Sequence, residues 1–107
     1  MTKRLKKRYI AFSSDPKASP DALFRAIKSS YQELFGVLGA SYAHLKLVKT
    51  YADKGVAVVH CALEKVPHLI LSAAAITHLN GERVAVRIVT ISGTMKGIKE
   101  KLRKKVD

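Results

Sequence analysis

The chain has 107 residues, of which 48% are hydrophobic, and a net charge of +12. This length supports one domain with a real core, and the hydrophobic fraction argues against a disordered chain. No apolar run has the length of a membrane span, and no signal-peptide core follows the basic N-terminus. Cys61 is the single cysteine, which excludes an intramolecular disulfide framework, so we expect a cytoplasmic protein.

The positive charge is concentrated at the two ends of the sequence. Eleven Lys and Arg residues fall within residues 1–8 and 96–105, and, less Glu100 and Asp107, they account for +9 of the +12. We interpret 1–107 as one domain with a basic arm at 1–7 and a basic helix at 94–107. A solvated surface is the plainer alternative, but the pattern favours a polyanionic partner. The predicted RNA-binding residues are Lys3, Arg4, Lys6, Lys7, Arg8, Lys96, Lys99, Lys101, Arg103, Lys104 and Lys105.

The N-terminal third predicts a strand followed by a long helix. Apolar residues alternate in RYIAFS at 8–13, which is typical of a half-buried strand. SPD at 19–21 supplies an N-cap, a proline at the first helical position and an early carboxylate. We expect this helix to end at Gly36 and Gly39. Its predicted core face holds Leu23, Ile27, Leu34 and Leu38.

The middle of the chain predicts a hairpin and a second helix. Residues 43–51 alternate in character, DKG at 53–55 forms a short turn, and VAVVHCAL at 56–63 is the return strand. The second helix is predicted at 66–79, opened by a proline and stopped by NG at 80–81.

The last third predicts a β-branched strand at 83–92, a break at Gly93 and a third helix. The element order β-α-β-β-α-β-α indicates an α+β, ferredoxin-like or RRM-like βαββαβ sandwich with an added C-terminal helix. Met95, Ile98 and Leu102 should anchor that helix. The sheet residues expected to face the first two helices are Ile10, Phe12, Leu45, Leu47, Val59, Cys61, Val86 and Ile88. The opposite, open face should carry Val48, Val58, Val89 and Ile91 among Lys46, His60 and Arg87.

The residue types do not favour catalysis or metal binding. Nearly all acidic residues fall in predicted turns or near helix ends, and the first loop lacks the anion-binding arginine of acylphosphatase-type chemistry. His60 and Cys61 are neighbours on a strand, so they point to opposite faces and cannot bind one ion together. We therefore expect no catalytic residue, no metal site and no cofactor bound by the chain itself.

RNA binding is the stronger hypothesis, with phosphate as the expected contact. An RNA-recognition motif stacks bases on aromatic residues of its two central strands. Here Tyr9 lies on the first of them, and the other has no aromatic residue. The basic ends should therefore grip phosphate and shape rather than base sequence. Ser92, Gly93 and Thr94, with Lys96 beside them, are a candidate phosphate site at a helix start, and a plain helix cap fits them equally well.

The helix predicted at 66–79 has apolar residues on two faces. Leu69, Ile70, Ala73 and Ile76 can serve the core. A helix of this kind is either sandwiched within its own fold or docked on another protein. The candidate partner-binding residues on the second face are Leu71, Ala75 and Leu79.

Several segments resemble ribonuclease P protein component 2, the archaeal counterpart of the Pop-five subunit of ribonuclease P and MRP. They are KKRYIAF at 6–12, LFGVLGA at 34–40, GVAVVHCAL at 55–63 and NGERVAVRIVTISGTMK at 80–96, followed by the basic tail. The likeness covers nearly the whole chain. In two departures, His60 stands where an arginine is expected, and the N-terminal extension is short.

This resemblance implies a non-catalytic subunit that helps a catalytic RNA, with its own magnesium ions, to remove 5′ leaders from precursor tRNA. The implied partners are ribonuclease P RNA and ribonuclease P protein component 3, in a two-plus-two heterotetramer, with precursor tRNA met indirectly and no membrane. One alternative is a general RNA-binding or ribosome-associated ferredoxin-like module. Another is an anion-responsive regulatory domain or acylphosphatase-like enzyme.

Overall fold

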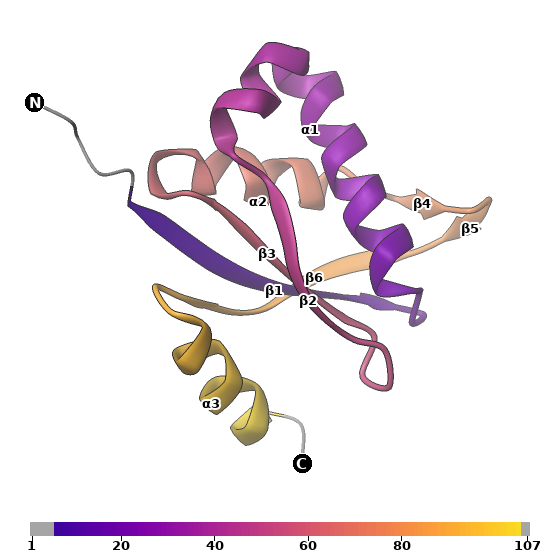
Figure 1. Ribbon diagram of the computed structural model, residues 1–107. Helices are drawn as coiled ribbons and strands as arrows, with labels where there is room; N and C mark the ends of the chain where they lie inside the picture. Colours follow the sequence, from indigo (N-terminus) through magenta and orange to yellow (C-terminus); the bar gives the residue numbers. More distant parts are fainter. Residues whose placement is uncertain (1–5, 106–107) are drawn as a thin grey trace, which may run out of the picture.

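The computed structural model describes residues 6–105, with side chains described as far as Arg103 (Figure 1). The larger strands are β1 (Lys7–Asp15), β2 (Lys46–Tyr51), β3 (Val56–Ala62) and β6 (Ala85–Ser92). The helices are α1 (Pro20–Ala43), α2 (Val66–Ala74), which follows a 3-10 turn at Leu63–Lys65, and α3 (Met95–Lys105). A small hairpin consists of β4 (His78–Leu79) and β5 (Glu82–Arg83).

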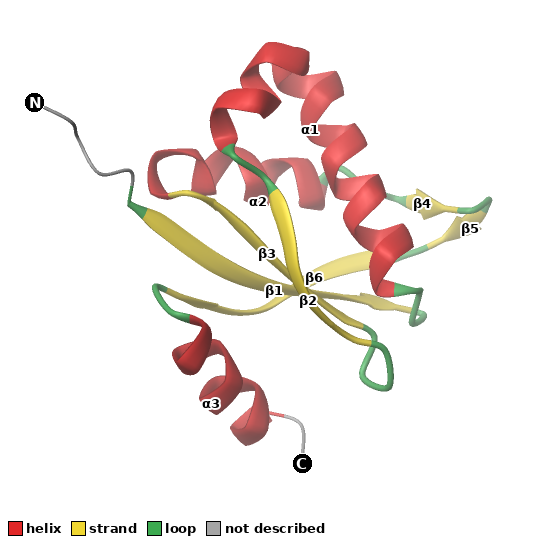
Figure 2. Ribbon diagram, viewed as in Figure 1, coloured by secondary structure: helices red, strands yellow, loops and turns green. Residues whose placement is uncertain are grey.

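The four larger strands form one antiparallel sheet in the order β2-β3-β1-β6. Helices α1 and α2 cover one face of this sheet, and α3 lies against the other (Figures 1 and 2). This arrangement confirms the predicted ferredoxin-like α+β fold with an added C-terminal helix. No helix within residues 6–105 is long and apolar enough to cross a membrane.

The main core lies between the sheet and the pair α1 and α2. Because side chains alternate along a strand, Ile10, Phe12, Val59 and Cys61 all point to this side and are fully buried. From the helices come Leu23, Ile27, Tyr31 and Leu69. The predicted helix-facing residues Leu45, Leu47 and Val86 pack at the edge of the same core. Burial of this apolar surface is the main stabilising contribution to the fold.

The sequence suggested that the opposite face of the sheet is open, but α3 covers part of it. Ile98 and Leu102 are buried there against Ala11, Val56 and Val58. The predicted apolar stripe of α3 needs a partner surface, and the alternate residues of the central strands supply one. Lys46 and Arg87 remain exposed.

A bulge in β6 changes which of its residues face the core. Ala11 pairs with Thr90 and Phe12 with Ile88, so Val89 is the extra residue. A bulge inverts the alternation beyond it, and Ile91 consequently packs against the main core rather than on the other face. Ile88, predicted as core, is 38% exposed because β6 is an edge strand.

The first helix bends at Gly36, whose φ of 81° and ψ of 161° are not helical. The helical conformation resumes and continues to Ala43, so the prediction that the helix ends at Gly36 and Gly39 was wrong. The bend changes the direction of the last part of α1, which still contributes Ala40 and Ala43 to the core. Leu34 and Leu38, predicted as core residues, are 48% and 68% exposed.

The second helix ends at Ala74, five residues earlier than predicted. Asn80 and Gly81 have φ values of 53° and 81°, the conformation of a tight hairpin turn, which Asn-Gly favours strongly. They join β4 to β5 through the pairs His78 with Arg83 and Leu79 with Glu82. The Asn-Gly pair therefore marks a hairpin rather than a helix stop.

Candidate nucleic-acid interface

The two basic segments of the sequence meet at one end of the sheet. β1 and β6 are antiparallel and Tyr9 pairs with Ser92, so the start of β1 lies beside the end of β6. A Cβ atom placed on Gly93 would be 3.4 Å from Nη1 of Arg8. Arg8 therefore packs against the turn that leads into α3, and the backbone at Gly93 leaves room for it.

The candidate phosphate site at 92–94 is a capped helix start. The hydroxyl of Thr94 accepts a hydrogen bond from the amide of Gly97 at 3.0 Å, and the hydroxyl of Ser92 accepts one from the amide of Thr94 at 3.3 Å. These bonds satisfy two amides that a phosphate would otherwise have used. The geometry therefore favours capping as the role of Ser92 and Thr94.

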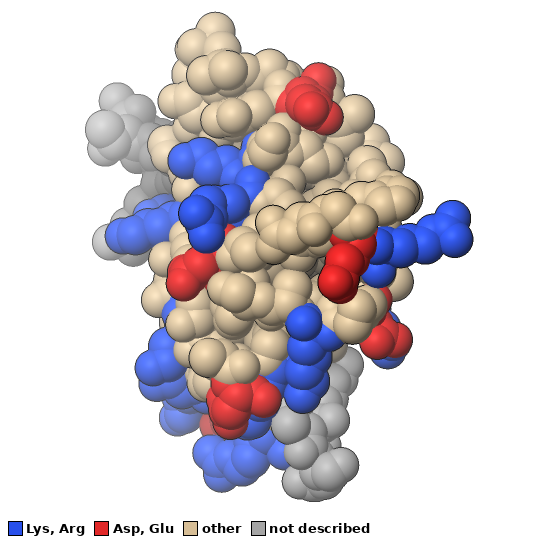
Figure 3. Space-filling view, turned by 90° about the vertical axis from the view of Figure 1, so that its right-hand side faces the viewer, with Lys and Arg blue, Asp and Glu red and all other residues tan. Residues whose placement is uncertain are grey.

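Basic side chains project into solvent from α3. Lys96, Lys99 and Arg103 are exposed, and Lys101 donates a hydrogen bond to the carbonyl oxygen of Ile91 at 2.8 Å. Figure 3 shows Lys and Arg side chains over the middle and lower parts of one face, whereas the top, formed by the bent part of α1, shows none. Lys6 and Lys7 are exposed at the start of β1. Of the other predicted cations, Lys3 and Arg4 and the side chains of Lys104 and Lys105 lie outside the described residues.

His60 is buried on the α3 side of the sheet, and its ring lies 5.6 Å from that of Tyr9. Burial lowers the pKa of His60, because it disfavours the imidazolium, and the positive charge of Lys7 lowers it further. No hydrogen-bond partner of its Nδ1 atom lies among the described residues. At neutral pH this position is therefore uncharged, unlike the arginine that the resemblance led us to expect.

The described residues contain no group of three or more His, Cys, Asp or Glu side chains arranged to hold a metal ion. Cys61 lies in the main core, opposite to His60, and burial raises the pKa of its thiol to about 11. A thiol with so little thiolate at neutral pH is a poor nucleophile.

The three candidate partner-binding residues do not form one helical face. Leu71 is 54% exposed on α2, Ala75 is exposed at the C-cap, and Leu79 lies in β4. Sequence reasoning missed a larger apolar surface on the last part of α1. It consists of Leu34, Val37, Leu38 and Tyr42, all exposed. The sequence signal for this surface was Gly36, a glycine inside the helical pattern, at which α1 bends.

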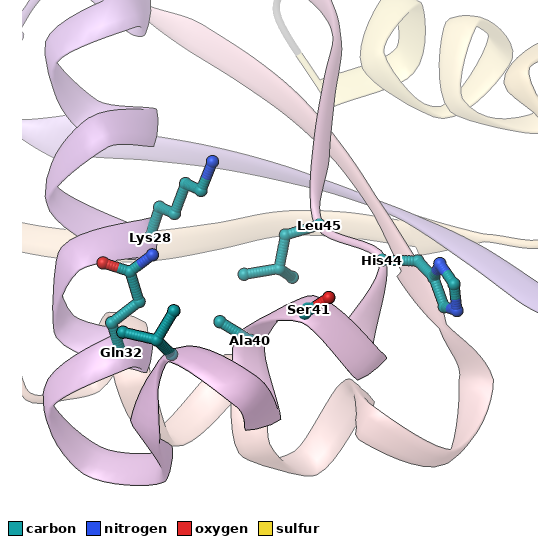
Figure 4. A pocket seen from close by; sticks show the side chains of 7 residues that line it. Lys28, Gln32, Ala40, Ser41, His44 and Leu45 are labelled. Carbon is teal, nitrogen blue, oxygen red and sulfur yellow. The ribbon is translucent and has the colours of Figure 1, made fainter.

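The bend in α1 also encloses a pocket of about 270 Å³. Lys28 and Gln32 line it from the long segment of α1, and Ala40 and Ser41 line it from the segment after Gly36 (Figure 4). The apolar surface at 34–42 therefore lies beside a hollow that Lys28 borders.

Comparison with known proteins shows which family the chain belongs to. The model of the Rpp14/Pop5 family matches residues 8–103, which include the sheet, α1, α2 and most of α3. The chain belongs to the Rpp14/Pop5 family.

Similar proteins are found among archaea. Proteins named ribonuclease P protein component 2 from Methanosarcina mazei and Methanosarcina barkeri are 33% and 36% identical to this chain over 92% of its length, and the matches cover 84% and 73% of those proteins. The protein of that name from Pyrococcus abyssi is 33% identical over 94% of this chain and 86% of its own. A chain in the cryo-EM structure of yeast ribonuclease MRP shares the fold, with a TM-score of 0.61, 12% identity and coverage of 97% of this chain and 96% of that chain.

Proposed function

We propose that this member of the Rpp14/Pop5 family is a protein subunit of ribonuclease P, which removes 5′ leaders from precursor tRNA. The observation that carries the proposal is the 33–36% identity, over more than nine-tenths of the chain, to proteins named ribonuclease P protein component 2. In the proposed complex the RNA holds the active site and its magnesium ions, and this chain supplies no catalytic group and no cofactor.

The proposed role of the subunit is to supply positive charge to the RNA. Folding of a large RNA brings phosphates close together, and their repulsion must be offset by cations. The exposed residues of α3 and the start of β1 supply positive charge at one end of the sheet, including Lys96 and Lys99. Contacts with phosphate position the protein without reading base sequence, so the expected readout is RNA shape.

The protein partner in the proposal is ribonuclease P protein component 3, in a two-plus-two assembly. The surface at Leu34, Val37, Leu38 and Tyr42 is the best candidate for this contact, because large apolar side chains exposed together are typical of protein interfaces. Leu71 is a second candidate.

The test is co-purification of the tagged chain from its native host. A ribonuclease P subunit should bring down one large RNA together with another protein, in constant ratio across salt washes that remove tRNA and ribosomal RNA. A tagged variant with Leu38 changed to Asp keeps the basic surfaces and serves as the matched control, which should lose the protein but retain affinity for RNA. Recovery of mixed RNAs without a partner protein would instead favour the general RNA-binding module.

A further inference from the structure

A second group of basic side chains surrounds a pocket that no sequence pattern indicated. The pocket has a volume of about 310 Å³ and lies between the β2–β3 hairpin and α3, and we call it the hairpin–α3 pocket. The residues that line it are Lys49, Tyr51 and Lys54 from the hairpin and Lys99, Leu102 and Arg103 from α3.

The aromatic ring of Tyr51 lies close to the ammonium groups of two of these lysines. The Nζ atoms of Lys49 and Lys54 lie 5.8 Å and 5.7 Å from the centroid of the Tyr51 ring, within the range of cation–π attraction. Tyr51 in turn packs against the cluster that contains Leu102. This attraction favours positions of both side chains near the pocket, which lowers the entropy cost of binding.

The four cations of the pocket lack a neutralising partner within the described part of the chain. The ion pair recorded there joins Arg87 to Asp15 and involves none of them. Asp53 and Glu100 are near in sequence, but both side chains are exposed and neither forms an ion pair with the pocket. Four like charges around one opening repel one another, and an anion placed between them relieves that repulsion.

We propose that the hairpin–α3 pocket binds a phosphodiester group of an RNA backbone. The planar fork of Arg103 can pair with two phosphate oxygens, and the three ammonium groups supply further charge-assisted hydrogen bonds. The inference rests on the proposed function, because the partner must be an RNA.

The course of α3 favours a polymer over a small anion. The helix begins beside Arg8 and Gly93 and reaches the pocket at Lys99 and Arg103. An RNA strand that lies along α3 therefore meets cations at the helix start and again at the pocket. A free phosphate would use the pocket alone.

The test compares RNA binding by wild type and by the double variant Lys49→Gln, Lys54→Gln, across a salt series, with ribonuclease P RNA as the probe. Both lysines belong to the hairpin, so the variant leaves α3 intact. Loss of one phosphate contact should flatten the slope of log affinity against log salt by about 0.7 to 0.9 unit.

The matched control is Arg25→Gln, Lys28→Gln, which removes the same charge from α1 on the other side of the sheet (Figure 1). Its slope should equal that of wild type. Equal flattening of the slope in both variants would show that binding depends only on the net charge of the protein, and it would overturn the proposal that the pocket binds phosphate. A wild-type slope in the hairpin variant would also overturn it while leaving the proposed function intact, whereas failure of wild type to bind the RNA would refute both.

A double-mutant cycle tests Tyr51 as a positioning residue. Tyr51→Leu should weaken RNA binding in the wild-type background but have no further effect once Lys49 and Lys54 are Gln, because its role is to hold them. Tyr51→Phe keeps the ring and should bind as wild type does. An additive effect of Tyr51→Leu would mean that the ring serves only the fold.

Discussion

The guanidinium of Arg8 lies against Gly93, so the first strand and the start of the last helix are joined at a single basic surface. The two residues are far apart in sequence and adjacent because β1 and β6 are antiparallel neighbours. The two basic ends of the sequence therefore form one surface in the folded protein. Helix α3 extends this surface toward the β2–β3 hairpin.

If this surface binds RNA, removing cations from α3 should change the salt dependence of binding. For Lys96, Lys99 and Arg103 all changed to Ala, we expect the slope of log affinity against log salt to flatten by about one to two units, because Lys99 and Arg103 share one phosphate in the hairpin–α3 pocket. Lys101 is left in place because it bonds to the carbonyl of Ile91. The fold should survive, since Ile98 and Leu102 still anchor the helix. A slope equal to that of wild type would mean that these residues are only a solvated face.

Gly97→Ala should destabilise the protein although alanine favours helices. A Cβ atom at this position would overlap the hydroxyl oxygen of Ser92 and lie 3.1 Å from that of Thr94, both of which cap α3. We expect a loss of about 1–3 kcal/mol in the free energy of unfolding, as for other overpacked sites, measured by denaturant titration. Adding Ser92→Ala should recover part of the loss. A stabilised single variant would contradict this packing.

The lowered pKa of His60 makes folding stability depend on pH. Below the unfolded-state value of 6.5, the unfolded chain takes up a proton that the folded protein resists. Stability should therefore be complete above pH 6.5 and decrease as the pH falls toward the lower, folded-state pKa. Burial is the main cause of the lowered pKa, and the charges of Lys7 and Lys46 act in the same direction, whereas a hydrogen bond with the backbone of His44 raises the pKa.

The measurement is thermal unfolding between pH 7.5 and 5.5. Wild type should lose stability over this interval, and His60→Phe, which cannot titrate, should lose less. His78→Gln, at an exposed position, should follow wild type. Parallel curves for wild type and His60→Phe would contradict the burial of His60.

The apolar surface of α1 gives a prediction about assembly. Leu38→Asp and Leu71→Asp change exposed positions, so each monomer should fold, as circular dichroism would show. At a docking surface an unpaired buried charge costs about 3–5 kcal/mol, so the Leu38 variant should fail to form the heteromer in size-exclusion chromatography. Leu69→Asp, at a fully buried position, should unfold the monomer and serves as the control for a substitution in the core. Normal assembly by the Leu38 variant would place the interface elsewhere.

Most of the fold could be predicted because its strands alternate in a simple way. Ile10, Phe12, Val59 and Cys61 follow strict alternation and all lie in the core as expected. Alternation failed at Ile91, where one bulged residue inverts the pattern. Helical periodicity failed at Leu38, because the bend at Gly36 changes the direction of the helix.

Only part of the candidate site could be predicted from the sequence. The basic residues of α3 stand out as a run, and the apolar stripe of Ile98 and Leu102 correctly predicted which side of the helix is buried. Lys49 and Lys54 gave no such signal, because they join Arg103 only when α3 crosses the sheet. A sequence pattern shows the period of one element but not which elements meet.

The most direct test of the central claim is cleavage of precursor tRNA in a reconstituted system, over a range of magnesium concentrations. The RNA subunit, with this chain and its protein partner, should cleave at lower magnesium than the RNA alone, because protein cations offset repulsion between phosphates. The α3 triple variant should require more magnesium than wild type, and the protein without RNA should leave the substrate intact. Site-specific cleavage by RNA-free protein, or an unchanged magnesium requirement when the proteins are added, would contradict the account.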